Sequence, residues 1–138
     1  MLVGVIDDVI FVADSYYDKI FLSPLSPSDT SIIPLPFRNL TLPVGLDFDP
    51  FGNHLYWTDY THGTVVRASV DGQNQEIIRS GVPQATGIAL DLVGGNLYWI
   101  NNGNKTIEVS KLDGSYWKVL VSNFSSSPYD IALDTKRG

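Results

Sequence analysis

The sequence predicts an all-β protein, and three observations point to this fold class. Short apolar and aromatic segments recur along the whole chain, each bounded by Gly, Asn, Asp or Pro, which is the pattern of strands. No segment keeps a 3.6-residue apolar period long enough for a stable helix. The sequence also repeats itself at an offset of 42 residues, which relates Tyr56 to Tyr98 (98 − 56) and Gly45 to Gly87. A four-stranded unit of this length is typical of a blade in a β-propeller.

The second and third units of the repeat each contain four expected strands. In order along the chain, these strands cover residues 43–49, 54–59, 64–70 and 75–80, and then 85–91, 96–101, 106–112 and 117–121. The pairs Asp71-Gly72 and Asp113-Gly114 separate the third strand from the fourth. Because Asp-Gly readily supplies the positive φ angles of a type I′ turn, we expect a tight hairpin at both places. Each unit is therefore predicted to be an antiparallel meander.

The first unit is looser, and a further unit begins at the end of the chain. Strands are expected at 9–14, 19–25 and 31–37, and Leu2–Asp7 is an alternative first strand for this blade. The segment "PYDIALD" at 128–134 matches the first strand of the second and third units. We therefore interpret residues 1–138 as a partial propeller with repeats at about 9–42, 43–84 and 85–127, and with 128–138 starting another repeat.

The Leu-Tyr-Trp runs at 55–57 and 97–99 indicate how these sheets pack. Neighbouring residues of a strand point to opposite faces of its sheet, so three consecutive apolar residues require both faces to be buried. Blades stacked face to face around an axis meet that requirement. A β-sandwich or a single up-and-down barrel is the competing arrangement, but neither predicts a strict repeat of four-stranded units.

Composition narrows the classes of function. The net charge of −6 and the lack of a Lys/Arg-rich run argue against nucleic-acid binding, which needs a basic surface. Cysteine is absent, so disulfides and thiolate metal sites are excluded. No stretch reaches the ~18 apolar residues of a membrane-spanning helix, so direct membrane insertion of this segment is not expected. The N-terminus lacks the basic region of a signal peptide, and a targeting segment would have to lie outside this chain.

The motif residues make the sequence resemble the YWTD, or LDL-receptor class B, repeats of six-bladed β-propellers. This family includes the LDL receptor and its relatives, the Wnt co-receptors and nidogen, and the resemblance extends from Val9 to Asp134. It implies about three blades of an expected six. The residues that carry the motif are Tyr56, Trp57, Thr58 and Asp59 in the second unit, Tyr98, Trp99 and Asn101 in the third, and Asp14 in the first.

These motif residues are expected to be architectural. Tyr56 and Trp57 have large apolar rings that can fill the gaps between adjacent blades. Asp59 ends its strand, where its carboxylate can accept hydrogen bonds from backbone N–H groups of the following turn. A catalytic role for Asp59 would require a base, a nucleophile or a metal partner, and the sequence offers no such group beside it. No catalytic residue, metal or cofactor is therefore predicted.

The resemblance implies a non-enzymatic extracellular or cell-surface module, part of a receptor or matrix protein, that binds a protein ligand through one face of the propeller. That face is formed by the loops joining strand two to strand three and strand four to the next strand one. Exposed aromatic and arginine side chains are good interface anchors. The candidates on these loops are Tyr16, Tyr17, Arg38, Tyr60, His62, Arg79 and Gln84.

Two further features fit an extracellular module. The Asn-x-Ser/Thr sequence occurs at Asn39, Asn104 and Asn123, in expected loops or at strand starts where a glycan can be attached. The two histidines, His54 and His62, titrate in the endosomal range and could sense pH. Their positions in turns favour the simpler interpretation that both are solvated.

Two alternatives concern the class of protein and the missing blades. A propeller hydrolase of the lactonase or strictosidine-synthase type would hold a metal in its channel, and the inner strands offer Asp47, Asp49, Asp91, Asp130 and Asp134. Three blades do not close a ring. The remaining blades would come from the rest of a longer chain, which we favour, or from a second copy related by a two-fold axis.

Overall fold

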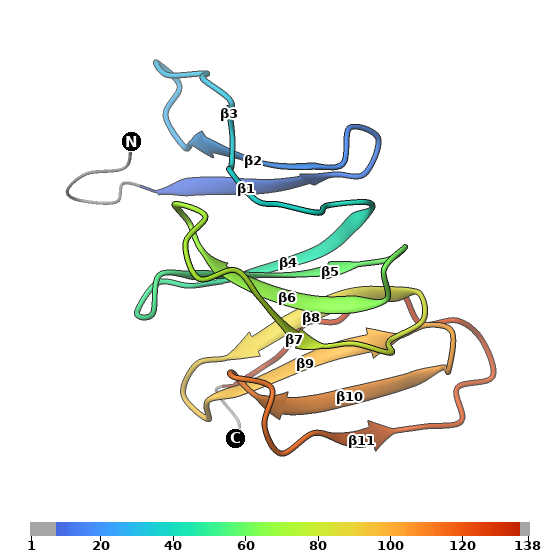
Figure 1. Cartoon of the computed structure of the whole chain (residues 1–138). Helices are drawn as coiled ribbons and strands as arrows, with labels where there is room; N and C mark the ends of the chain where they lie inside the picture. Colours follow the sequence, from blue (N-terminus) through green and yellow to red (C-terminus); the bar gives the residue numbers. More distant parts are fainter. Residues whose placement is uncertain (1–7, 136–138) are drawn as a thin grey trace.

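A computed structural model describes residues 8–135 as three stacked antiparallel sheets (Figure 1). The alternative first strand at 2–7 lies outside the described residues. Within each sheet the strands are hydrogen-bonded in the order of the sequence. The first sheet contains β1 (Val9–Asp14), β2 (Lys19–Pro24) and β3 (Ile33–Pro34). The second contains β4 (Pro43–Asp49), β5 (His54–Asp59), β6 (Thr64–Ser69) and β7 (Glu76–Arg79), and the third contains β8 (Ala85–Asp91), β9 (Asn96–Asn101), β10 (Thr106–Lys111) and β11 (Lys118–Val121).

The all-β prediction is confirmed, and every strand expected in the second and third units forms. The first unit is less regular, because its last strand is reduced to Ile33–Pro34 where 31–37 was expected. Pro34 and Pro36 lack the backbone N–H that a continuing ladder would need. The segment 128–134 was expected as a strand, but it has no regular strand structure.

The second and third sheets have the same strand register. Tyr56 pairs with Arg67 in the second sheet, and Tyr98 pairs with Val109 in the third. The ladder is interrupted at equivalent places, between Val65 and Val66 in one sheet and between residues 107 and 108 in the other. Side chains 42 residues apart therefore occupy equivalent positions and can be compared directly.

The predicted type I′ turns are wrong. Only the glycine of each Asp-Gly pair has a positive φ, 87° at Gly72 and 89° at Gly114. In the second sheet, the Gly72 N–H donates to the Ser69 carbonyl at 2.8 Å, and the Ser69 N–H donates to the Gln73 carbonyl at 3.0 Å. These bonds close a three-residue loop ending in a left-handed glycine, which is the next most common hairpin connection.

The core lies in two layers between the sheets. Trp57 packs with Ile20 between the first and second sheets, whereas Tyr56 packs with Leu97 and Trp99 between the second and third. The side chains of Tyr56 and Trp57 are at most 1% exposed, so the expected burial of both faces is confirmed for the second sheet. The tryptophan face of a blade thus meets the preceding blade, and the tyrosine face meets the following one.

The inner strands approach one another closely at two equivalent glycines. A Cβ atom on Gly45 would collide with the Thr86 carbonyl oxygen of the next blade. A Cβ atom on Gly87 would lie 2.8 Å from the Asp130 Cα atom, and the Gly87 N–H donates to the Tyr129 carbonyl at 2.9 Å. The segment 128–134 therefore lies against β8 much as β8 lies against β4.

Candidate binding face and the contacts beneath it

Conserved spacing in the repeat places a side-chain acceptor at the start of each loop between strands two and three. Oδ1 of Asp14 accepts hydrogen bonds from the backbone N–H groups of Tyr16 and Tyr17, at 2.9 and 3.0 Å. Oδ1 of Asp59 accepts one from the N–H of His62 at 2.9 Å. These bonds hold the two loops in compact turns and determine which side chains the loops expose.

Asp59 also connects its loop to the preceding blade. Its Oδ2 atom accepts a hydrogen bond from the Thr41 N–H at 2.9 Å and lies 3.3 Å from Nδ1 of His62. The Thr41 hydroxyl is 2.9 Å from the same imidazole. With 1% of its side chain exposed, Asp59 ties two loops together from below the surface.

Thr58, the third residue of the motif, joins inner strands rather than loops. Its hydroxyl accepts a hydrogen bond from the Gly45 N–H at 2.9 Å and donates to the Thr86 carbonyl of the next blade. The missing side chain at Gly45 leaves room for this contact. Thr58 therefore bridges the second and third blades near the inner edge.

Backbone bonds between loops make one end of the stack continuous. The Val82 N–H donates to the Gly63 carbonyl at 2.9 Å, and the Gly103 N–H donates to the Pro83 carbonyl at 3.0 Å. A depression of about 510 Å³ lies between residues 60–63 and 81–84. The structure thus brings together the loops that the sequence assigned to one face.

The seven candidate ligand-face residues differ in how far they reach solvent. Tyr16 and Tyr17 are 85% and 66% exposed, and their rings meet edge to face with centroids 4.9 Å apart. Tyr60 is half-buried, and Arg79 is held by Trp117, with its guanidinium carbon 3.8 Å from the ring centroid. The remaining candidates, all exposed, are Arg38, His62 and Gln84.

A polar contact that the sequence did not indicate crosses from the second blade to the third. The Tyr56 hydroxyl donates to the Leu112 carbonyl at 3.3 Å, and Nη1 of Arg67 donates to the same carbonyl at 3.0 Å and to the Tyr56 oxygen at 3.2 Å. Nε of Arg67 also pairs with Glu76 at 2.5 Å. Burial raises the pKa of Tyr56, and the hydrogen bond from Arg67 opposes that rise.

Sequence reasoning also missed Glu108, a buried acid that is 3% exposed. Its Oε1 accepts hydrogen bonds from the indole N–H groups of Trp99 and Trp117, at 3.3 and 2.9 Å. Its Oε2 accepts from the Asn101 amide at 2.8 Å and the Thr106 hydroxyl at 2.9 Å. The one available signal was an acid at the repeat position that Val66 fills in the second unit.

The histidines and the glycosylation candidates lie at the surface. His62 has 47% of its side chain exposed, and His54 is half-buried with its ring 6.3 Å from that of Tyr56. The three asparagines of the Asn-x-Ser/Thr sequences are all exposed. Two of them have a left-handed backbone, with φ of 58° at Asn39 and 66° at Asn123; the third is Asn104.

The acids proposed for a channel metal mainly accept backbone hydrogen bonds. Asp47 of β4 accepts one from the Leu90 N–H of β8 at 2.8 Å, which links two inner strands. The others named here bond within their own segments: Asp49 to residues 51 and 52, Asp91 to residue 94, and Asp130 to residue 131. Among residues 8–135, no group of three or more His, Asp or Glu side chains is placed to hold a metal ion.

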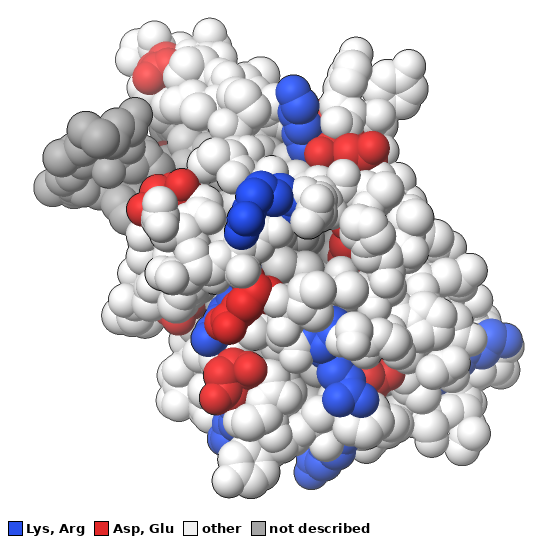
Figure 2. Space-filling view, viewed as in Figure 1, with Lys and Arg blue, Asp and Glu red and all other residues white. Residues whose placement is uncertain are grey.

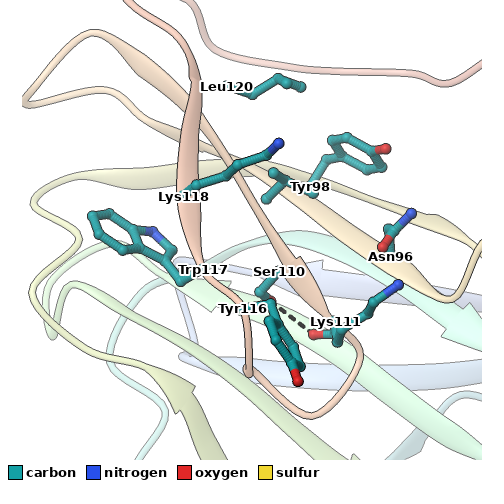
Figure 3. Close-up of a pocket in the computed structure, with 9 residues that line it drawn as sticks. Asn96, Tyr98, Ser110, Lys111, Tyr116, Trp117, Lys118 and Leu120 are labelled. Atoms are coloured by element: carbon teal, nitrogen blue, oxygen red, sulfur yellow. Dashed lines mark hydrogen bonds between the residues drawn. The ribbon is translucent and has the colours of Figure 1, made fainter.

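The last blade has an uncovered outer face. Figure 3 shows Tyr98, Lys118 and Leu120 around a depression of about 570 Å³ over β9–β11. Tyr98 is only half-buried there, unlike its equivalent Tyr56, because no further sheet lies against this face in the described part of the chain. Figure 2 shows charged side chains on the viewed side as single residues or small mixed groups among uncharged atoms.

Three stacked four-strand meanders with tyrosine and tryptophan rings between them define a partial β-propeller. The family described as "Low-density lipoprotein receptor repeat class B" matches residues 95–135. Low-density lipoprotein receptor-related protein 4 from Homo sapiens and from Mus musculus are each 39% identical over 44 residues, which is 32% of this chain and 2% of the relative. The chain is a partial propeller of this YWTD-repeat family.

Solved structures agree with this assignment. A chain in a crystal structure of a nidogen/laminin complex superposes with a TM-score of 0.85 and 27% identity, over 94% of this chain and 49% of that chain. A proposed 6-phosphogluconolactonase from Bacteroides uniformis superposes with a TM-score of 0.54 and 20% identity, over 81% of this chain and 36% of that one. The second match shows the fold alone. This chain thus spans about half of the nidogen/laminin-complex chain and a small part of the receptor. In residues 8–135 no helix has the length and apolarity to cross a membrane.

Proposed function

We propose that this chain is a non-enzymatic, protein-binding part of an extracellular or cell-surface propeller. One observation carries the proposal: the loops between strands two and three and between blades form a continuous end face with an exposed tyrosine pair. The likeness to a chain in a nidogen/laminin complex supports a protein as the ligand. The receptor relatives support a cell-surface setting.

The tyrosine pair is suited to anchor a protein ligand. Tyr16 and Tyr17 project from one short loop, and Asp14 holds the backbone of both residues. Aromatic side chains presented on a fixed backbone lose little conformational freedom on binding, so they frequently dominate interface energies. Arg38, His62 and Gln84 are exposed on neighbouring loops and can supply polar contacts at the rim.

The hydrolase alternative has less support. It would use carboxylates of the inner strands, and Asp47 instead accepts the N–H of Leu90 and joins two blades. The lactonase-like structure shares the fold at 20% identity, which carries no argument about activity. The architecture of the motif residues is explained by blade packing and loop closure alone.

Surface plasmon resonance against laminin tests the proposal, because laminin is named in the matching complex. We expect the double substitution Tyr16→Ala and Tyr17→Ala to weaken binding by about tenfold or more, roughly 1.4 kcal/mol. Phe51→Ala is the matched control, because Phe51 is 90% exposed in the β4–β5 loop at the opposite end of the blade. Equal effects of the two variants would contradict binding through the loop face.

A further inference from the structure

A hollow of about 760 Å³ between the first and second blades has a filled counterpart between the second and third. On the second blade it is lined by Trp57, Asp59, Thr64, Val66 and Gln75, among others. The positions 42 residues further on are Trp99, Asn101, Thr106, Glu108 and Trp117. These five residues form the buried network described above.

The two sites have the same backbone frame. Val66 pairs with Ile77 just after the interruption of one ladder, and Glu108 pairs with Val119 just after the interruption of the other. Gln75 and Trp117 therefore leave equivalent points at the start of the last strand. The difference between the sites lies in their side chains.

In the third blade, side chains of the chain itself fill the site. The Glu108 carboxylate reaches inward and the Trp117 indole donates its N–H to it at 2.9 Å. The Arg79 guanidinium, from the preceding blade, covers the indole ring at 3.8 Å. An indole lying between a carboxylate and a cation is thus the occupant that this blade geometry accepts.

In the second blade, the equivalent side chains are too short to do this. Val66 carries no polar group, and the Gln75 amide is turned toward the preceding blade. Its Oε1 accepts the Arg38 N–H at 2.9 Å, and its Nε2 donates to the Arg38 carbonyl at 2.7 Å. The space that Glu108 and Trp117 occupy in the next blade is therefore left open.

The open site keeps polar groups whose counterparts are paired. Trp99 and Thr106 donate to Glu108, whereas no hydrogen bond joins the Trp57 indole N–H or the Thr64 hydroxyl to any residue in 8–135. The Asp59 carboxylate lines the hollow where Asn101 presents an amide in the next blade. The site thus combines an apolar floor, a carboxylate acceptor and a nearby cationic rim at Arg38.

We propose that this hollow binds a tryptophan side chain of a partner protein, with the ring on Trp57 and Val66 and the indole N–H directed to Asp59. Arg38 takes the place that Arg79 has over Trp117. The charge pattern matches the chain's own filled site, in which an indole N–H also meets a carboxylate. Only the source of the tryptophan rests on the proposed protein-binding function; the pocket itself does not.

N-acetyltryptophanamide is the probe, and the indole N–H signals of the protein in a ¹H–¹⁵N correlation spectrum are the readout. The chain contains three tryptophans, so each signal can be assigned by substitution. We expect the Trp57 signal to shift saturably in the millimolar range, and the Trp99 and Trp117 signals to stay in place. N-acetylleucinamide, which lacks the ring and its N–H, should not produce the shift.

Gln75→Trp supplies the side chain that the third blade uses and should weaken probe binding by about tenfold or more. The absence of a saturable shift in the wild-type protein, or a shift of Trp117 in place of Trp57, would overturn the proposal. So would unchanged binding by a folded Gln75→Trp variant. The Tyr16→Ala and Tyr17→Ala protein separates the two hypotheses, because it should lose a protein ligand of the loop face and still bind the probe.

Discussion

The buried carboxylate of Glu108 shows how one residue can organise a blade. Four donors converge on it, from the side chains of Trp99, Asn101, Thr106 and Trp117. Buried charges are tolerated where several hydrogen bonds satisfy them, and removing the acceptor would leave all four donors without a partner. Glu108 thereby holds the tryptophan of the motif, its own loop and the start of the last strand in one arrangement.

We expect Glu108→Ala to lower the free energy of unfolding by about 3 kcal/mol, because several buried donors lose their acceptor. Urea unfolding followed by tryptophan fluorescence measures this difference. Lys111→Ala, at an exposed position of the same strand, is the control and should change stability by less than about 0.5 kcal/mol. Similar effects of the two substitutions would show that the network does not stabilise the fold.

Some of these roles could be anticipated from the sequence, and others could not. The burial of Tyr56 and Trp57 follows from strand alternation, since adjacent apolar residues must occupy both faces. The same alternation places Glu108 on one face of its strand, but it does not show what lies opposite. Trp117 reaches that face from a turn after the hairpin, and only the folded chain reveals the contact.

At the level of strands, close packing of the inner edge depends on glycine. Gly45 and Gly87 occupy equivalent positions, and each lies against the next inner segment without room for a Cβ atom. The repeated spacing of these glycines was visible in the sequence, whereas the neighbours they face were not. The inner edge is therefore built from strand to strand, and 128–134 continues it beyond β8.

Gly87→Ala is expected to push residues 128–134 away from β8, because the new Cβ atom would lie 2.8 Å from the Asp130 Cα atom. The Gly87 amide should then exchange its hydrogen about tenfold faster or more, since its bond to the Tyr129 carbonyl is lost. Gly95→Asn is the control, because its equivalent Asn53 already has a positive φ of 55°. An unchanged exchange rate at Gly87 would rule out this close packing as the support of the segment.

For the molecule as a whole, the stack of three blades has two apolar ends. Ile10 and Val12 are 44% and 46% exposed on the first sheet, and Leu120 is 49% exposed beside Tyr98 on the last. Faces of this kind normally meet a partner surface. We propose that they meet further blades, supplied by a longer chain or by a second copy.

The isolated chain should therefore associate as its concentration rises, and the pair Val12→Lys and Leu120→Lys should return it toward a monomer. Size-exclusion chromatography with light scattering measures both states. Val93→Lys is the control, because Val93 is 94% exposed in the β8–β9 loop and away from either face. A folded wild-type chain that stays monomeric at every concentration would contradict association through the blade faces.

The strand segments, their 42-residue repeat and the burial of both faces of the second blade follow from local pattern. They depend on the two-residue period of a strand and on side-chain hydrophobicity, and both are written in the order of the residues. The hairpin geometry after Ser69, the Glu108 network and the hollow beside Val66 are different. They depend on how far side chains from separate blades reach toward each other, and this is decided when the sheets stack.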